Sequence, residues 1–322
     1  MRAIRIEQAG GPEVMKLAEL PTPAPGPGQA LVQVKAAGVN FIDIYQRMGV
    51  YKMPLPFTTG QEGAGVVEAV GEGVTEVRPG DVVAWAGPAG SYATHQVIPA
   101  ARLVPVPKGL DPRQAAAAML QGMTAHYLVH DTFPLRAGHT CVIHAAAGGV
   151  GQLFTQFARR AGAHVIGTAG GPDKVAKARA AGAQDVIDYR AQDFEAEVKR
   201  ITGGKGVDVV YDSVGKDTWE KSLRSLRPRG LLVVFGLSSG PVPPVDPQVL
   251  AQGGSLFLTR PTLGSYVISR EELLARAAAV LGAVQRGEVK LQIEKELPLA
   301  DAPEAHRLLA SRATSGKLLL IP

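Results

Sequence analysis

The first third of the chain alternates apolar and polar residues over short stretches. Residues 32–36 and 65–70 repeat with the two-residue period of half-buried β-strands. Turn-forming residues separate such stretches, as in the Pro- and Gly-rich segment 21–28 and in the turn 78–81, which leads into the apolar segment 82–85. Residues 1 to about 110 are therefore predicted to form mostly β-structure.

From about residue 113 the pattern changes to apolar strands alternating with amphipathic segments. A helix is predicted over 114–130. The predicted strands that follow are 140–146, 164–169, 185–189, 207–212 and 231–237, with helices over 150–161, 173–181, 193–201 and 217–226. Because parallel strands need helical crossovers, this alternation predicts an α/β fold with a Rossmann-type, doubly wound parallel sheet.

The end of the chain returns to a different pattern. A helix is predicted over 271–286, and the apolar strand 318–321 has no other strand of its own sheet nearby in the sequence. We expect this strand to join the first domain. The predicted domains are thus 1–120 together with 261–322, and a Rossmann domain over 121–260.

Composition narrows the class of protein. The chain has 322 residues, of which 46% are hydrophobic and 20% charged, which excludes a disordered chain and suits two domains. No apolar run approaches the about 18 residues of a membrane span. The first ten residues carry charges where a secretory signal needs an apolar stretch. We expect a cytoplasmic protein with no membrane partner.

Charge and cysteine content exclude further classes. The formal net charge is +5, but the basic residues are scattered, with no block longer than Arg159-Arg160. This favours a mildly basic surface over a nucleic-acid site. Cys141 is the single cysteine, so neither an intramolecular disulfide nor a multi-thiolate zinc site can form.

A glycine-rich turn joins the first predicted Rossmann strand to its helix. It reads Ala146-Ala147-Gly148-Gly149-Val150-Gly151, with Ala146 at the first glycine position of the dinucleotide-binding motif. Gly148 lets the backbone approach a pyrophosphate, Gly151 allows close packing of helix and strand, and the helix N-terminus offers free amides to the anion. The order strand, loop, helix predicts a dinucleotide site, with a βα turn that binds no ligand as the alternative.

The second predicted strand bears on the choice of dinucleotide. NAD sites usually place Asp or Glu about 20 residues after the loop, on the ribose 2′-hydroxyl. Here the strand ends Thr168-Ala169-Gly170-Gly171, and Lys174 follows within one helical turn. The missing acid favours NADP over NAD. Lys174 could bind the 2′-phosphate or could equally be an ordinary solvated lysine on the face of the helix.

Several motifs carry a family resemblance. Residues 36–43, 60–65 and 209–215, together with the phosphate loop, resemble the medium-chain dehydrogenase/reductase superfamily over nearly the whole chain. Segments 40–45, 121–127, 259–262 and 311–314 are more narrowly similar to the quinone oxidoreductases of the zeta-crystallin type. The resemblance implies a mostly β, GroES-like catalytic domain beside the Rossmann domain. It also implies a homodimer paired through the edge of the Rossmann sheet, which segment 255–259 would supply.

The chain departs from the zinc-dependent members of that superfamily. They bind a catalytic zinc through Cys where this chain has Asn40 and through His where it has Gln61, and such a site needs about three protein ligands. We therefore expect no metal. An unactivated ketone needs a Lewis acid, whereas the oxyanion of a reduced quinone is delocalised and phenol-like, so hydrogen bonds and a solvent proton suffice.

The resemblance also implies roles for single residues. The acceptor cleft would be lined by Asn40, Tyr45 and Tyr51, with Gln61 nearby and Arg260 at its border. The 2′-phosphate would lie among Lys174, Tyr189 and Arg312. The nicotinamide and the pyrophosphate would lie beside Gly122, Thr124, Gly149 and Val150. Phe235 and Gly236 would lie under the nicotinamide. Asn40 is the only asparagine of the chain, which suggests that its amide is hard to replace.

Structural alternatives remain for these residues. Asn40 could instead complete a turn, Tyr45 and Tyr51 could be packing aromatics, and Arg260 could cap a helix or form a salt bridge. The hypothesis we prefer is NADPH-dependent reduction of a small quinone. The alternatives are reduction of an enone or alkenal double bond with the same cofactor, and a nucleic-acid-binding or structural second role.

Overall fold

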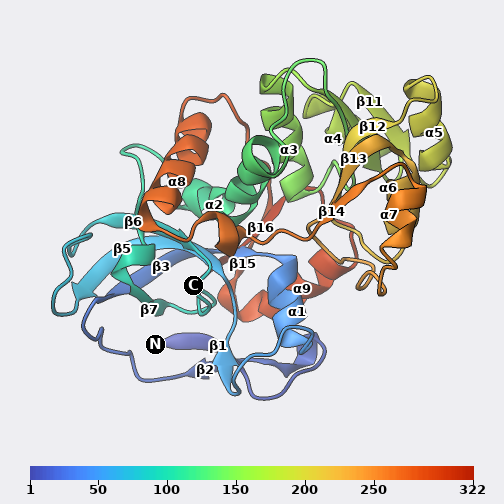
Figure 1. Ribbon diagram of the computed structural model, residues 1–322. Helices are drawn as coiled ribbons and strands as arrows, with labels where there is room; N and C mark the ends of the chain where they lie inside the picture. The colour runs from blue at the N-terminus through green and yellow to red at the C-terminus, as the bar shows by residue number, and fades with distance from the viewer. The chain divides into compact units, whose positions relative to one another are not determined.

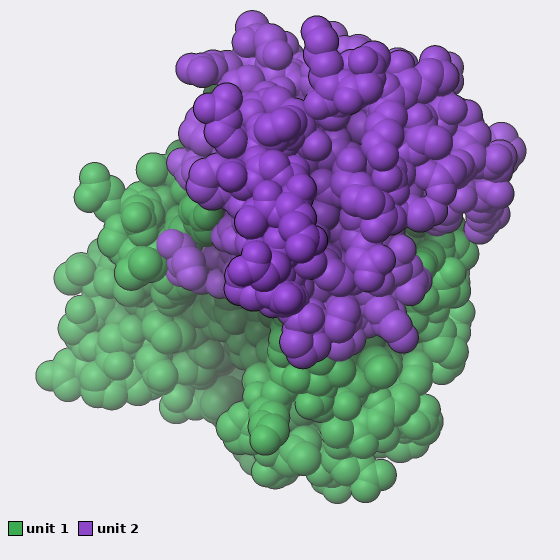
Figure 2. Space-filling model, turned by 45° about the vertical axis from the view of Figure 1, so that its right-hand side comes forward, with its two compact units in different colours: residues 1–123, 266–322 green, residues 124–265 purple.

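The computed structural model describes residues 1–322 and divides into two compact units. One consists of Met1–Met123 and Tyr266–Pro322, and the other of Thr124–Ser265; Figure 2 shows them in separate colours. Each unit has a hydrophobic core of its own.

The first unit is built on two sheets. Its strands are β1 (Arg2–Ile6), β2 (Met15–Glu19), β3 (Gln29–Val39), β4 (Phe57–Thr58), β5 (Glu62–Val70), β6 (Val82–Ala86), β7 (His95–Pro99), β8 (Val104–Pro105), β15 (Ile293–Pro298) and β16 (Lys317–Ile321). The larger sheet has the order β15-β16-β3-β5-β6-β8, with β7 also paired to β3, and the smaller one the order β2-β1-β4. The predicted β-rich character of the first third of the chain is confirmed.

Strand β3 passes through the centre of the larger sheet. Its middle part alternates, with Val32 and Val34 buried and Gln33 and Lys35 exposed. Its last four residues, 36–39, are all buried, and β16 pairs with this part of the strand, Leu318 opposite Val39 and Leu320 opposite Ala37. The predicted return of the final strand to the first domain is confirmed by this pairing.

Four α-helices belong wholly or partly to this unit. They are α1 (Phe41–Arg47), α2 (Pro112–Tyr127), α8 (Arg270–Gln285) and α9 (Ala302–Ala310). Helix α8 begins one residue before its predicted start, where Ser269 and Glu272 form a capping box. The helix predicted over 114–130 is α2, but its last part is a π-helical turn, η3 (Leu128–Thr132).

The second unit holds one parallel sheet of six strands. They are β9 (Thr140–Ile143), β10 (His164–Ala169), β11 (Asp185–Asp188), β12 (Val207–Asp212), β13 (Leu226–Val234) and β14 (Phe257–Thr259), in the order β11-β10-β9-β12-β13-β14. Its helices are α3 (Gly149–Arg160), α4 (Pro172–Ala180), α5 (Phe194–Ile201), α6 (Trp219–Arg224) and α7 (Gln248–Gln252). In Figure 1, α3 and α4 lie on one side of the strands and α5 and α6 on the other. The predicted doubly wound parallel sheet is confirmed.

Several predicted boundaries in this unit were wrong, and the strand predicted over 231–237 also ends early, at Val234. The strand predicted over 140–146 ends at Ile143, because Ala145 has a φ of 53° that an extended strand does not adopt. The helix predicted over 217–226 is shorter, and β13 begins at Leu226 rather than at 231. Strand β13 contains Arg229 with a φ of 61°, and its register against β12 shifts there. This irregular backbone hid the start of the strand in the sequence.

Candidate active site

Asn40 lies where strand β3 ends and helix α1 begins. It is the N-cap of α1, and its backbone N–H donates to Asp43 Oδ2 at 2.9 Å. The residue is only 4% exposed. Asn40 therefore does complete a turn, which was the structural alternative considered from the sequence. It also belongs to a buried polar network.

The side-chain amide of Asn40 has partners on both of its polar atoms. Nδ2 donates to Glu62 Oε2 at 2.9 Å and to the carbonyl of Gly38 at 3.3 Å. Oδ1 accepts from Lys317 Nζ at 2.8 Å and, more weakly, from Gln121 Nε2 at 3.5 Å. Lys317 also forms an ion pair with Glu62, and the two side chains are 3% and 0% exposed. Sequence reasoning missed both members of this ion pair.

A second buried chain of hydrogen bonds starts at Asp43. Its carboxylate accepts from the Tyr92 hydroxyl at 3.1 Å, and that hydroxyl lies 3.2 Å from His306 Nε2. Arg47 Nη1 lies 3.1 Å from His306 Nδ1. Because a guanidinium only donates, Nδ1 is the acceptor and the imidazole proton is on Nε2. The donors therefore point in one direction, from Arg47 through His306 and Tyr92 to Asp43.

Burial sets the protonation of this chain. It raises the pKa of Asp43 from 3.8 to about 7, although the Asn40 backbone N–H and the Lys317 charge oppose the change. Burial, and then the charge of Arg47, lowers the pKa of His306 from 6.5 to about 3. At neutral pH His306 is neutral, and Asp43 is near the midpoint of its titration.

Helix α1 carries an aromatic group on its half-exposed face. The rings of Tyr45 and Tyr51 meet edge to face, with centroids 5.6 Å apart, and Phe41 lies 6.1 Å from Tyr45. The Tyr51 N–H donates to the Tyr45 carbonyl at 3.2 Å, which holds the chain after the helix. Half-exposed aromatic rings of this kind can stack on a flat ligand ring.

Gln61 joins the network through its backbone. Its N–H donates to Asp43 Oδ1 at 3.1 Å, and its carbonyl accepts from the Gly87 N–H at 2.8 Å. Its side chain is half-buried. The structure thus brings Asn40 and Gln61 to the same carboxylate, that of Asp43.

The predicted phosphate loop forms the start of α3 in the second unit. Gly148 is the N-cap, and no side chain caps the helix. A Cβ atom on Gly151 would lie 2.7 Å from the Cα of Ala146, so only glycine permits this close approach of helix and strand. The free N–H groups and the helix dipole at this end suit an anion. These residues therefore fit the pyrophosphate of a dinucleotide.

The ends of β10 and β11 lie side by side next to this loop. A Cβ atom on Gly170 would be 2.5 Å from the Tyr189 hydroxyl and 3.2 Å from Arg190 Nε, so both side chains lie close to Gly170. Lys174 is half-buried in the first turn of α4. Sequence reasoning missed Arg190, although its position directly after Tyr189 at a strand end was a usable signal.

A carboxylate does reach this place, from the neighbouring strand. Asp188 accepts hydrogen bonds from the backbone N–H groups of Gly171 and Arg190, each at 3.0 Å. These hydrogen bonds lower the pKa of Asp188. The second strand lacks an acidic residue at its end, but Asp188 brings a carboxylate to the same place. This carboxylate is already hydrogen-bonded to the loop backbone.

Two further cofactor candidates lie on α2, which runs from the first unit into the second. Gly122 is close to α8, where an added Cβ would be 2.5 Å from Val280 Cγ1. Packing against α8 therefore already explains this glycine. Thr124 is buried, at 8% exposure.

The remaining candidates are spread over both units. Phe235 and Gly236 follow β13, where a Cβ on Gly236 would be 2.5 Å from the Ser213 carbonyl oxygen. Arg260 follows β14 and donates to the Pro261 carbonyl at 3.2 Å. Arg312 belongs to the first unit and has a φ of 57° just after α9. Their roles toward a ligand remain predictions.

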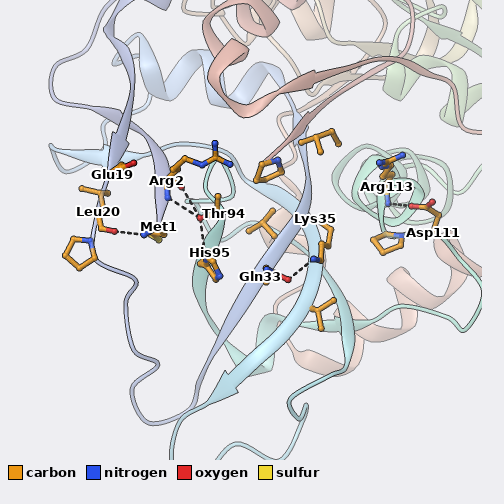
Figure 3. Close-up of a pocket in the computed structure, with 16 residues that line it drawn as sticks. Met1, Arg2, Glu19, Leu20, Gln33, Lys35, Thr94, His95, Asp111 and Arg113 are labelled. Atoms are coloured by element: carbon orange, nitrogen blue, oxygen red, sulfur yellow. Dashed lines mark hydrogen bonds between the residues drawn. The ribbon is translucent and has the colours of Figure 1, made fainter.

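An open depression of about 1220 Å³ lies on the first unit, and none of the candidate site residues lines it. Figure 3 shows its walls, where Lys35 donates to Gln33 and the Arg113 N–H to Asp111. Arginine, lysine and histidine side chains stand there together with Glu19 and Asp111. With charges of both signs present, the walls do not favour a ligand of either sign.

The structure has neither a metal-binding cluster nor a helix that could span a membrane. No group of three or more His, Cys, Asp or Glu side chains is arranged to hold a metal ion. None of the helices has both the length and the apolar character needed to span a bilayer.

Comparisons with known proteins cover both units. The family described as "Alcohol dehydrogenase GroES-like domain" matches residues 26–108, and the family described as "Zinc-binding dehydrogenase" matches residues 149–281. The quinone oxidoreductase of Pseudomonas aeruginosa is 47% identical, over 100% of this chain and 99% of that protein. A 2-haloacrylate reductase from Burkholderia sp. is 43% identical, over 98% of each.

A solved structure agrees with these relatives. The crystal structure of Escherichia coli quinone oxidoreductase complexed with NADPH matches with a TM-score of 0.98 and 43% identity, over 100% of both chains. The chain belongs to the quinone oxidoreductases of the medium-chain dehydrogenase/reductase superfamily.

Proposed function

We propose that this chain is an NADPH-dependent quinone oxidoreductase, which transfers reducing equivalents from NADPH to a small quinone. The observation that carries the proposal is its likeness, along its whole length, to an enzyme crystallised with NADPH. The uncapped, glycine-lined start of α3 supports it, because these residues fit the pyrophosphate of such a cofactor.

Each group of site residues has a distinct task in this proposal. NADPH, when bound, supplies a hydride equivalent. The N-terminus of α3 holds the pyrophosphate, while Gly148, Gly149 and Val150 keep side chains away from it or supply N–H groups. Tyr45 and Tyr51 stack on the flat acceptor ring, and Asn40 lines the acceptor site. Because the oxyanion of the reduced quinone is delocalised, the protein needs chiefly to orient the ring and to exclude water.

Selectivity for NADPH over NADH comes from cations near the end of β10. Lys174 in α4 and Arg190 beside Gly170 are the candidates within the second unit. Tyr189 adds a hydroxyl at the same place. Charge-assisted hydrogen bonds contribute about 1.5–3 kcal/mol each, less where solvent screens them. Two such contacts would favour NADPH by about 10²-fold. Arg312 is a further candidate, from the first unit.

A second acceptor class has its own supporting observation. The 2-haloacrylate reductase is 43% identical to this chain over nearly its full length. A haloacrylate, like an enone or an alkenal, carries a carbon–carbon double bond activated by an adjacent carbonyl group. Reduction of such a double bond by the same cofactor is therefore the alternative function.

The test follows loss of reduced-nicotinamide absorbance with purified protein. NADPH or NADH is combined with a small benzoquinone, an enone or 2-chloroacrylate, each with and without chelator. The proposal predicts oxidation that prefers NADPH, is fastest with benzoquinone and is unchanged by chelator. Turnover with the enone or 2-chloroacrylate alone would support the alternative. NADPH binding without turnover of any acceptor would contradict both.

We also propose that the protein is a homodimer that pairs through β14. This strand ends the sheet order, so one edge of its backbone has no strand partner within the chain. Phe257 on this strand is 60% exposed. An exposed edge strand with an apolar side chain is a ready surface for pairing with a second copy.

A further inference from the structure

The ion pair of Lys317 and Glu62 determines which way the Asn40 amide faces. An ammonium only donates hydrogen bonds, so the Asn40 atom 2.8 Å from Lys317 Nζ is the carbonyl oxygen, Oδ1. A carboxylate only accepts, so the atom 2.9 Å from Glu62 Oε2 is the nitrogen, Nδ2. The flipped amide would place donor against donor and acceptor against acceptor.

The pair is itself held in position from several sides. The other oxygen of Glu62, Oε1, accepts from the backbone N–H of Leu120 in α2 at 2.5 Å. A Cβ atom on Gly38 would collide with the Glu62 carboxylate and lie 2.7 Å from the Cε of Lys317. The absence of a side chain on β3 thus makes the room that the two buried charges occupy.

The amide of Asn40 has no spare donor. One of its N–H groups points to Glu62 and the other to the Gly38 carbonyl. On the acceptor side, Lys317 takes the short contact at 2.8 Å, and Gln121 is 3.5 Å away. Asn40 therefore offers its carbonyl oxygen, and not an N–H, to any group that replaces Gln121 beside it.

We propose that Lys317 and Glu62 are positioning residues of the acceptor site, which hold the amide of Asn40 in this one orientation. The inference rests on the proposed function, in which Asn40 lines that site. Lys317 reaches the acceptor site through Asn40, since its ammonium is buried among Asn40 and Glu62 and does not reach solvent. Loss of the ammonium frees the amide to rotate, so its carbonyl oxygen is no longer fixed toward a donor in the site, such as the hydroxyl group that the quinone gains on reduction.

The test is a double-mutant cycle between Lys317 and Asn40. Lys317→Met keeps an unbranched side chain as far as Cε and removes the ammonium donor, and Asn40→Ala removes the amide. Alone, Lys317→Met should lower kcat/KM for benzoquinone about tenfold or more, while the Kd for NADPH changes less than twofold. In the Asn40→Ala background the same change should lower kcat/KM less than twofold, because the group it positions is gone. Lys16→Met, on the exposed face of β2, is the matched control and should change nothing.

Two further variants separate positioning from simple loss of folding. Gly38→Ala keeps every charge but displaces the ion pair, so it should lower kcat/KM for benzoquinone with the Kd for NADPH retained. Lys317→Arg keeps a cationic donor and should recover activity that Lys317→Met loses. If Lys317→Met does not fold, Gly38→Ala can replace it in the double-mutant cycle. Its effect on kcat/KM is then compared between the Asn40 protein and the Asn40→Ala variant.

The possible failures are distinguishable. A tenfold loss from Lys317→Met in both backgrounds would overturn the proposal, because Lys317 would then act by another route. So would full activity of both Lys317→Met and Gly38→Ala. Full activity of Asn40→Ala would remove Asn40 from the acceptor site, and the proposal with it. An unaltered protein that turns over no quinone would refute the proposed function itself.

Discussion

Replacing His306 with Gln should reveal the titration of Asp43 as a change of stability with pH. In the unfolded chain Asp43 titrates near 3.8 and His306 near 6.5, whereas in the folded protein the values are about 7 and about 3. Between pH 3.8 and 6.5 the folded state therefore carries one proton on Asp43, and the unfolded state carries one on His306. The two states bind equal numbers of protons, so the pair gives no slope in this window.

Each residue taken alone gives a slope, and the two signs are opposite. The raised pKa of Asp43 contributes stability that is complete below pH 3.8 and is lost as the pH rises to about 7. The lowered pKa of His306 contributes stability that is complete above 6.5 and is lost as the pH falls to about 3. Without His306 only the Asp43 contribution remains. The free energy of unfolding of His306→Gln, relative to the parent, should then fall by about 3 kcal/mol as pH rises across the window.

The assay is guanidinium unfolding at several pH values within this window. The chain has two tryptophans, and Trp85 is fully buried in the first unit. A Trp219→Phe background therefore makes fluorescence report on the unit that contains Asp43 and His306. The comparison of His306→Gln with the parent cancels the titration of every group except His306, so isolating Asp43 needs a second reference that lacks both residues.

The matched control is the double variant Asp43→Asn/His306→Gln, which lacks both titrating groups. Its stability relative to the parent should be independent of pH across the window, whatever its absolute loss. A constant difference between His306→Gln and this double variant would refute the reasoning, because the two proteins differ only at Asp43 and the result would show that Asp43 does not titrate with a raised pKa in the folded protein.

Three further predictions concern the second unit. Lys174→Ala and Arg190→Ala should each raise the KM for NADPH up to about tenfold and leave that for NADH nearly unchanged; equal effects in steady-state kinetics would remove both from the 2′-phosphate site. Gly151→Val should cost about 1–3 kcal/mol of stability and abolish NADPH binding in a fluorescence titration, whereas undiminished binding would contradict the close approach of α3. Phe257→Asp should halve the mass measured by light scattering after gel filtration, and an unchanged dimer would place the interface elsewhere.

The Rossmann half was predictable because its signal is local. Strands β9, β10 and β12 are short apolar runs that are each followed by a helix, so the pattern identified β10 and β12 to the residue. Where the backbone departs from regular geometry, at Ala145 and Arg229, the same pattern misplaced the strand ends. Arg190 directly follows a predicted strand, but its approach to Gly170 depends on the pairing of β11 with β10, which the local pattern does not show.

The buried charges of the first unit were not predictable from local pattern. Lys317 precedes an apolar strand and reads as a solvated residue, yet it lies against Asn40, 277 positions earlier in the chain. Glu62 directly follows Gln61, and from the sequence it too reads as a solvated residue. Burial of both follows from the pairing of β16 with β3 and of β3 with β5. Such long-range strand pairing decides which charged side chains lose contact with water. The residues next to Lys317 and Glu62 in the sequence give no sign of this pairing.

The orientation of Asn40 also bears on the chemical durability of the chain. Asparagine is thermolabile, since on heating its side-chain carbon is attacked by the next backbone nitrogen and ammonia leaves. In this chain the only asparagine is buried, its nitrogen is bound to Glu62 and Gly38, and the next residue, Phe41, begins a helix. The backbone cannot turn to reach the side chain without breaking that helix. The same contacts that orient the amide therefore protect the one asparagine of this chain from deamidation.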